Sequence, residues 1–157
     1  MVEQPTLNRQ AEGSTPSVPI TKGETVRKRD RRALLAYVRR CADVMELRDW
    51  EIALSRDTAD PGVAAQILWS NARRYATLTV EADFRSQPLS DVRETIAHEL
   101  MHLHYAASWD MVLHDLDELL GKPAQRVFWQ AWKRTTEYAI EASSLAVAKH
   151  LPLIDWP

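Results

Sequence analysis

Hydrophobic and polar positions in the first half of the chain repeat with two different periods. Apolar residues spaced by three and four predict a helix from Val26 to about Leu47. The segments that follow alternate or are rich in β-branched and aromatic residues, which predicts strands at 50–54, 63–69 and 75–80. A short polar stretch separates the last two strands, so they are expected to pair as an antiparallel hairpin.

The second half of the chain is predicted to be helical. Ser90 or Asp91 is the expected N-cap of a helix that runs through residues 95–102, which contain no Gly or Pro. A helix at 111–120 is expected to end at Gly121, and a longer one, with Pro123 in its first turn, is expected to reach about His150. Within that long helix the apolar positions define a stripe: Phe128, Ala131, Ala139, Ala142 and Ala146, with Tyr138 and Leu145 at one edge. Helices and strands in this order predict an α+β domain.

Length and composition indicate one globular domain. The chain has 157 residues, of which 45% are hydrophobic and 27% charged. Residues 1–24 are rich in Pro, Thr, Ser, Gln and Gly and are expected to form a disordered leader, which leaves 25–157 as the domain. No apolar run approaches the length of a membrane span and no signal sequence is visible, so a cytoplasmic location without a membrane partner is expected. Cys41 is the only cysteine, which excludes an intrachain disulfide and a thiolate zinc cage.

The charge of the chain is distributed unevenly. The formal net charge is −2, yet residues 22–40 hold eight of the twenty basic side chains. A basic segment can meet nucleic acid, but it is more often a solvated helix face. Because the remainder of the chain is acidic, weak and salt-sensitive binding of nucleic acid is expected at most. The sequence does not set the oligomeric state.

The motif H-E-x-x-H at residues 98–102 carries the candidate chemistry. On a helix, His98 and His102 project from one face about one turn apart, so their imidazoles can take two corners of a zinc tetrahedron. Glu99 lies about 100° further round the helix and can reach a water on the metal without being a ligand. This pattern predicts a zinc site with Glu99 as the catalytic general base.

The sequence around this motif resembles the active-site helix of zincin metallopeptidases. Metzincins continue with a Gly and a third His at fixed spacing, and residues 103–108 lack that pattern. The chain looks most like the gluzincin-like small domains of bacteriophages and actinobacteria. The resemblance implies a zincin-like fold: an N-terminal helix, a small three-stranded and largely antiparallel sheet, the H-E-x-x-H helix, and a C-terminal helix that carries the third ligand. It also implies that an extended substrate lies along an edge strand, for which residues 75–80 are the candidate.

A catalytic zinc usually has three protein ligands, so His98 and His102 need one more. Glu137 and Glu141 lie one turn apart on the predicted last helix and share a face. By resemblance to gluzincins, Glu137 is assigned as the ligand and Glu141 as the carboxylate that holds a ligand histidine in its tautomer. The reverse assignment of the two acids stays open. His114 is the third ligand if the domain is instead SprT-like.

The predicted function is zinc-dependent hydrolysis of peptide bonds in a peptide or protein substrate. Glu99 takes the proton of the attacking water and returns it to the leaving amine. Tyr105 and Tyr138 are both candidates for stabilising the oxyanion, and no sequence argument chooses between them. The alternative prediction is a non-enzymatic regulatory or binding module in which the zincin-like fold contacts DNA or protein. The intact Glu99 favours the enzyme, because a structural zinc site has no use for that carboxylate.

Overall fold

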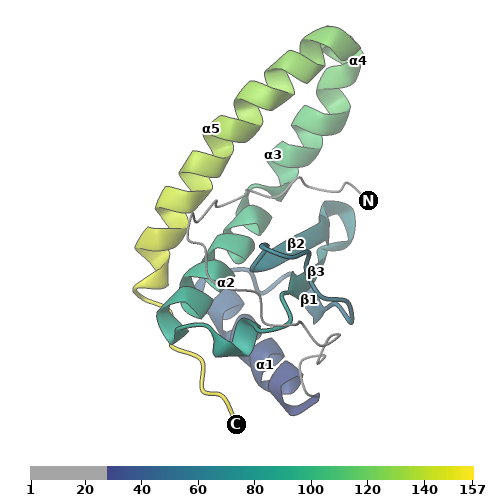
Figure 1. Ribbon diagram of the computed structural model, residues 1–157. Helices are drawn as coiled ribbons and strands as arrows, with labels where there is room; N and C mark the ends of the chain where they lie inside the picture. Colours follow the sequence, from purple (N-terminus) through teal and green to yellow (C-terminus); the bar gives the residue numbers. More distant parts are fainter. Residues whose placement is uncertain (1–27) are drawn as a thin grey trace.

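The computed structural model describes residues 28–157 (Figure 1). The predicted leader at 1–24 and the predicted helix start at Val26 lie outside the described residues. The elements follow in this order: α1 (Lys28–Val44), β1 (Glu51–Leu54), β2 (Ala65–Ser70), the 3-10 turn η1 (Asn71–Arg73), β3 (Tyr75–Val80), the 3-10 turn η2 (Phe84–Ser86), α2 (Leu89–His104), α3 (Ala106–Asp110), the π-helical turn η3 (Met111–Asp115), α4 (Leu116–Leu120) and α5 (Lys122–Ala148). Helices around one small sheet make this an α+β structure, as expected.

The three strands form a mixed sheet in the order β1-β3-β2. β2 and β3 pair antiparallel, with Ile67 opposite Leu78, whereas β1 and β3 pair parallel, with Ile52 opposite Ala76. The expectation of a largely antiparallel sheet is therefore wrong for one of the two pairings. β3 is the central strand, so residues 75–80 have neighbours on both sides and cannot be the edge strand along which a substrate lies. Among the described residues the edges belong to β1 and β2.

Helix α1 packs one apolar side on the core through Leu34, Tyr37, Val38 and Cys41, all buried. It ends three residues before the predicted end, and its C-terminal hydrogen bonds explain why. The Leu47 N–H donates to the Ala42 carbonyl (2.9 Å) and the Glu46 N–H to the Asp43 carbonyl (3.3 Å), with Glu46 at φ +56°. These are the bonds of a Schellman motif, which stops a helix by turning one residue left-handed.

Helix α2 is the central helix of the fold and contacts α1, β2 and α5. It begins at Leu89, where the Pro88 carbonyl accepts hydrogen bonds from the N–H groups of Asp91 (2.9 Å) and Val92 (3.0 Å). The prediction of Ser90 or Asp91 as the N-cap is therefore wrong, because both residues already belong to the first turn. Along one side of the helix Val92, Ile96, Leu100 and Leu103 are buried. That side fixes the rotation of the helix and so decides where the opposite face points.

The chain after α2 forms a helical arm, which we define as residues 106–135. In Figure 1 the arm is a hairpin in which α3, η3 and α4 run out beside the sheet and α5 returns. Gly121, at φ +72°, makes the turn between α4 and α5, and Pro123 lies in the first turn of α5 as predicted. The C-terminal half of α5 lies beyond the arm and packs along α2.

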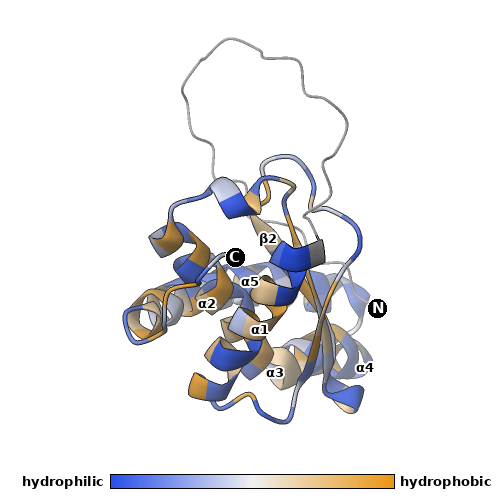
Figure 2. Ribbon diagram, turned by 90° about the horizontal axis from the view of Figure 1, so that it is seen from below, coloured by the Kyte–Doolittle hydropathy of each residue, from blue (hydrophilic) through white to orange (hydrophobic). Residues whose placement is uncertain are grey.

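Hydropathy along the ribbons agrees with this packing. Figure 2 shows apolar and polar stretches alternating along the helices, the pattern of elements that are buried on one side only. Within residues 28–157 none of the helices has both the length and the apolar character needed to cross a membrane.

Candidate metal centre

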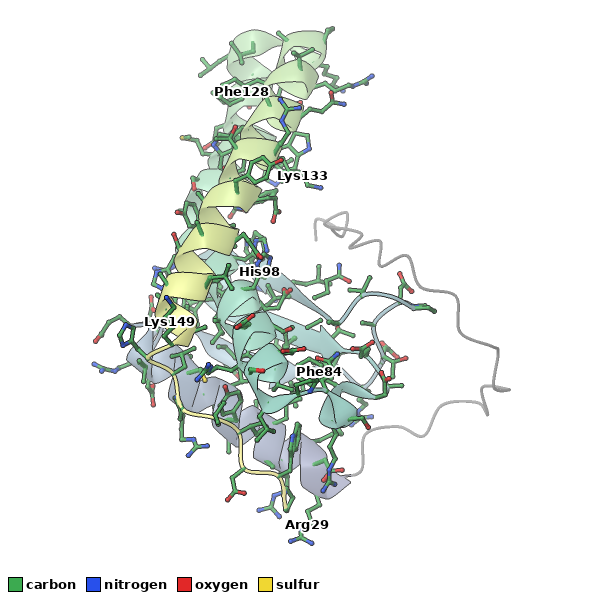
Figure 3. The ribbon with its side chains drawn as sticks, turned by 60° about the vertical axis from the view of Figure 1, so that its left-hand side comes forward. Arg29, Phe84, His98, Phe128, Lys133 and Lys149 are labelled. Atoms are coloured by element: carbon green, nitrogen blue, oxygen red, sulfur yellow. The ribbon has the colours of Figure 1, made fainter. Side chains whose placement is uncertain are left out.

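Helix α2 presents His98 and His102 on the face that looks toward α5. Their ring centroids are 5.0 Å apart, as expected for residues one helical turn apart. The side chain of His102 is almost fully buried, and His98 lies between α2 and α5 with a little more exposure. Figure 3 shows His98 beside the α5 ribbon. The buried apolar side of α2 therefore turns the two imidazoles toward α5.

Helix α5 supplies a carboxylate to the same place. A carboxylate oxygen of Glu137 lies 3.8 Å from Nε2 of His102 and 4.0 Å from Nε2 of His98. One ligand atom from each of the three residues falls within 4.8 Å of the others, so the group is close enough to hold a metal ion. Bonds of about 2.0–2.1 Å in a tetrahedron separate ligand atoms by about 3.3 Å. The two distances to Glu137 exceed that spacing by roughly 0.5–0.7 Å, and no pair of the three atoms exceeds it by more than about 1.5 Å.

Glu141 contacts the group from behind His98. Its carboxylate lies 3.0 Å from Nδ1 of His98, which is hydrogen-bonding distance, and its side chain remains 49% exposed. An ionised carboxylate can only accept, so Nδ1 carries the proton and Nε2 keeps its lone pair for the side where Glu137 lies. The structure thus brings Glu137 to both histidine Nε2 atoms and Glu141 to the other nitrogen of one ring.

Glu99 is buried next to this group and is not a member of it. The backbone N–H of Ile67 in β2 hydrogen-bonds the Glu99 carboxylate. Burial raises the pKa of Glu99 from 4.5 to about 8, the Ile67 hydrogen bond lowers it and the nearby Glu137 carboxylate raises it further. A cation held by the neighbouring histidines would favour the ionised form. The sheet therefore holds the Glu99 carboxylate beside the ligand group through the Ile67 N–H.

The histidines are held neutral by their surroundings. Burial lowers the pKa of His102 to about 3, with further lowering by the charges of His98 and Lys133. Burial also lowers the pKa of His98, against the opposing effect of Glu141. Burial raises the pKa of Glu137, which Lys133 counteracts. Neutral imidazoles are the form that binds a metal, so the site favours a cation over two protons.

Lys133 is a charged neighbour that the sequence reasoning missed. It lies on α5 one turn before Glu137, and its charge acts on both Glu137 and His102. In Figure 3 Lys133 of α5 lies nearer to the end of the arm than His98 of α2 does. Burial lowers the pKa of Lys133, while Glu137 raises it. The four-residue spacing to Glu137 was a visible signal for this contact.

Tryptophans enclose His102. The ring of Trp69, from β2, stacks on the His102 ring with centroids 6.1 Å apart and an angle of 23°. Trp109, fully buried in α3, contacts the rings of both Trp69 and His102. Trp129 and Trp132 of α5 extend the cluster through Trp109. Nδ1 of His102 is buried and has no hydrogen-bond partner among residues 28–157, so packing rather than a hydrogen bond holds this ring.

The remaining candidates lie away from the group. His114 is exposed in η3, within the arm, and is not one of the three clustered residues. Tyr138 is 73% exposed on the outer side of α5, which does not suit an oxyanion donor. Tyr105 caps the end of α2 and packs against the core. The exposure of Tyr138 therefore argues against it as the oxyanion-stabilising residue.

Comparisons of the chain with protein-family models, with curated proteins and with solved structures found no match. The geometry of His98, His102, Glu137 and Glu99 is therefore the basis on which a function can be assigned.

Proposed function

We propose that this protein is a zinc-dependent peptidase of the gluzincin kind. The observation that carries the proposal is the juxtaposition of two parts: three ligand atoms that converge from α2 and α5, and a buried carboxylate, Glu99, beside them. Two imidazole nitrogens and one carboxylate oxygen are the donor set of many catalytic zinc sites, which keep a fourth position open. A purely structural site has no need of the additional carboxylate.

Each residue has a distinct task in this proposal. His98, His102 and Glu137 hold the ion, and Glu141 fixes the His98 ring through its Nδ1–H. When bound, zinc supplies a water of lowered pKa and polarises the scissile carbonyl. The Glu99 carboxylate accepts the proton of the attacking water and donates it to the leaving nitrogen. The positive charge of Lys133 acts on both Glu137 and His102. In this proposal its ammonium group stabilises the negative charge that develops on the carbonyl oxygen.

The substrate is proposed to lie along β2 rather than β3. β2 is an edge strand, and it carries Trp69, whose ring stacks on His102. A peptide that added to this edge as a further strand would pass beside the ligand group. Ile67 of the same strand also donates its N–H to Glu99, so one strand positions both the general base and the proposed substrate.

Part of the basic segment takes part in the packing of α1. Arg31 donates to the carbonyls of Leu54 (3.2 Å) and Ser55 (2.5 Å). Asp30 is buried and forms an ion pair with Arg85. Arg29, Arg32, Arg39 and Arg40 are exposed, so the peptidase proposal is supported by the ligand group and Glu99 rather than by this segment.

The test compares the zinc-loaded protein with its Glu99→Gln variant on a mixture of fluorogenic peptides. The amide keeps the size of the side chain but cannot accept a proton, so we expect stoichiometric zinc and a fall in turnover of about 10²–10⁴-fold. Glu94→Gln, an exposed glutamate on the same helix, is the matched control and is expected to keep full activity. Wild-type protein that binds no stoichiometric zinc, or a Glu99→Gln variant that is fully active, contradicts the proposal.

A further inference from the structure

The outer face of α5 carries apolar side chains that are not covered by any other part of residues 28–157. Val127 is 69% exposed and Tyr138 73%, and Phe128 and Leu145 are also exposed. We call the regular row along this face the outer stripe: Phe128, Ala131, Thr135, Tyr138, Ala142 and Leu145, all exposed. These are largely the positions that the sequence marks as the apolar stripe of the helix. Contiguous exposed apolar surface on a protein commonly marks an interaction site.

The opposite face of α5 is the one that contacts the rest of the protein. Thr136, Ile140, Ser144 and Ala148, spaced by four residues, are buried and lie on the side that packs along α2. The outer stripe is therefore not part of the core of the single chain. Figure 1 shows α5 along the outside of the molecule, with α2, α3 and the sheet all on its other side. A solvated face of a helix normally carries charged residues, and none interrupts this stripe.

The spacing of the outer stripe is that of a coiled-coil seam. Its residues are separated alternately by three and four positions over 18 residues, which is about 27 Å of helix. A stripe of this spacing can pack against a second helix with the same spacing over its whole length. The seam has the large residues Phe128 and Leu145 at its ends, and Ala131, Thr135, Tyr138 and Ala142 lie between them.

A second copy of the same helix that runs antiparallel can face this stripe along its whole length. With a two-fold axis near the middle of the stripe, Phe128 of one copy packs on Leu145 of the other, Ala131 on Ala142, and Thr135 on Tyr138. Each of these contacts occurs twice, as two-fold symmetry requires. A parallel pair would instead place each residue of the stripe on its own counterpart, Phe128 on Phe128 and Ala131 on Ala131, so the apolar residues fit either direction and the charges beside them decide between the two.

The charges that border the stripe fit the same arrangement. Arg134 and Glu141 are both exposed, lie on the same border, and are seven residues apart. In the antiparallel pair Arg134 of one copy faces Glu141 of the other, again twice. In a parallel pair the same two side chains would face Ala139 and Ala146. We propose that the outer stripe of α5 is a dimerisation surface whose partner is a second, antiparallel copy of this chain.

The size of the surface sets the strength of the dimer. A single pair of helices in contact over about 27 Å buries less than the roughly 800 Å² per partner that is typical of stable complexes. The dimer is therefore expected to dissociate on dilution. The contact also reaches the candidate metal centre, because Glu141 is the residue that hydrogen-bonds His98.

A charge exchange tests this dimer in solution. Sedimentation velocity over a dilution series is expected to show wild-type protein passing from the 18.0 kDa chain to a species of twice that mass. Arg134→Glu alone and Glu141→Arg alone each place like charges opposite one another twice, and each is expected to weaken dimerisation at least about tenfold. A mixture of the two variants restores both ion pairs and is expected to dimerise again. Arg32→Glu, the same charge change at an exposed position on α1, is the matched control and is expected to behave as wild type.

Cysteine pairs test the direction of the helices. Protein with Ala131→Cys is mixed with protein with Ala142→Cys under mild oxidation, and a disulfide-linked dimer containing one of each is expected. A parallel arrangement would instead link Ala131→Cys to itself. The native Cys41 is buried and does not compete. A wild-type protein that stays monomeric at all concentrations, a dimer that Arg134→Glu affects no more than Arg32→Glu, or a failure of the mixed variants to associate overturns the proposal.

Discussion

The two ends of the molecule bury their apolar residues to very different degrees. Where α1, the sheet and α2 meet, a continuous cluster is formed by side chains such as Leu34, Ile67 and Leu100, all essentially inaccessible. In the arm, Trp109 and Val112 are the fully buried large side chains, while Leu119 is 77% exposed. Stability of the fold therefore resides in the sheet end, and the arm depends on a few tryptophans and on its attachment through α5.

The candidate metal centre lies at the junction of these two regions. His98 and His102 come from the best-buried helix, whereas Glu137 comes from the helix that continues into the arm. A metal ion would therefore tie the weakly packed region to the strongly packed one. Metal binding and the stability of the arm are therefore expected to depend on each other.

The largest expected effect is the stabilisation of the whole protein by the metal. Free zinc at about a thousand times its dissociation constant is expected to raise the free energy of unfolding by about 4 kcal/mol. Glu137→Ala removes the ligand that comes from α5 and is expected to lose most of that gain, whereas Gln130→Ala, exposed on the same helix, is expected to keep it. Chemical denaturation with zinc and with a chelator measures the difference. Equal gains in Glu137→Ala and wild type would show that α5 does not hold the ion.

Next in size is the difference between a core and an arm leucine. Leu100 is 1% exposed, and Leu100→Ala is expected to lower the free energy of unfolding by about 3 kcal/mol through the cavity it leaves. Leu119→Ala makes the same chemical change on the exposed arm and is expected to cost less than about 0.5 kcal/mol. Urea denaturation of both variants measures the two values. Similar losses for the two would mean that the arm is as well packed as the core.

A smaller effect is expected where Glu141 acts on the metal through His98. Glu141→Ala is expected to weaken zinc binding about 10–100-fold, because His98 loses the acceptor that fixes its tautomer. Glu137→Ala is expected to weaken binding further, since it removes a ligand atom. Competition with a chromophoric chelator measures both affinities, with Glu118→Ala on the arm as the control. If Glu141→Ala strips the metal and Glu137→Ala does not, the two acids have the reverse roles.

The smallest effect is a pH dependence of the metal-free protein. The pKa of Glu99 is raised from 4.5 to about 8 in the folded state, so its protonated form contributes stability that is full below pH 4.5 and is lost as the pH rises through 8. Between pH 6.5 and 8 the free energy of unfolding is expected to fall by at most about 1.4 kcal/mol per pH unit. The His102 contribution, with its pKa lowered from 6.5 to about 3, is complete above pH 6.5 and does not oppose this fall. Glu99→Gln is expected to flatten the profile, and an equal slope in both proteins would exclude Glu99 as its source.

Local patterns predicted the elements of the fold better than their pairing. Residues 75–80 alternate between buried and partly exposed positions, and β3 has the predicted bounds. The alternation says nothing about which strands lie on either side, so neither the parallel β1 pairing nor the central place of β3 followed from it. The stripe on α5 shows the same limit, because periodicity defines a face without stating whether the core or solvent meets it. On the other face of α5 three of the four buried residues are small, namely Thr136, Ser144 and Ala148, and they allow α2 to approach.

The candidate site, too, could be predicted from the sequence only in part. His98 and His102 lie together because of their spacing on one helix, which is a local property that the sequence displays. The contact of Trp69 with His102 joins a strand to a helix 33 residues later, and no spacing rule reports it. The Ile67 N–H that meets Glu99 is a backbone group of an edge strand, and its position depends on how α2 lies across the sheet.

The tryptophan cluster gives the protein a built-in optical reporter. Indole emission depends on what lies within a few ångströms of the ring, and the rings of Trp69 and Trp109 both have centroids 6.1 Å from that of His102, the first stacked and the second tilted. Trp129 and Trp132 lie 4.8 and 4.9 Å from Trp109 and stack on each other. Four of the six tryptophans of the chain are thus grouped around one candidate ligand histidine. A metal ion bound by His102 is therefore expected to change the emission of the unlabelled protein, without any added dye.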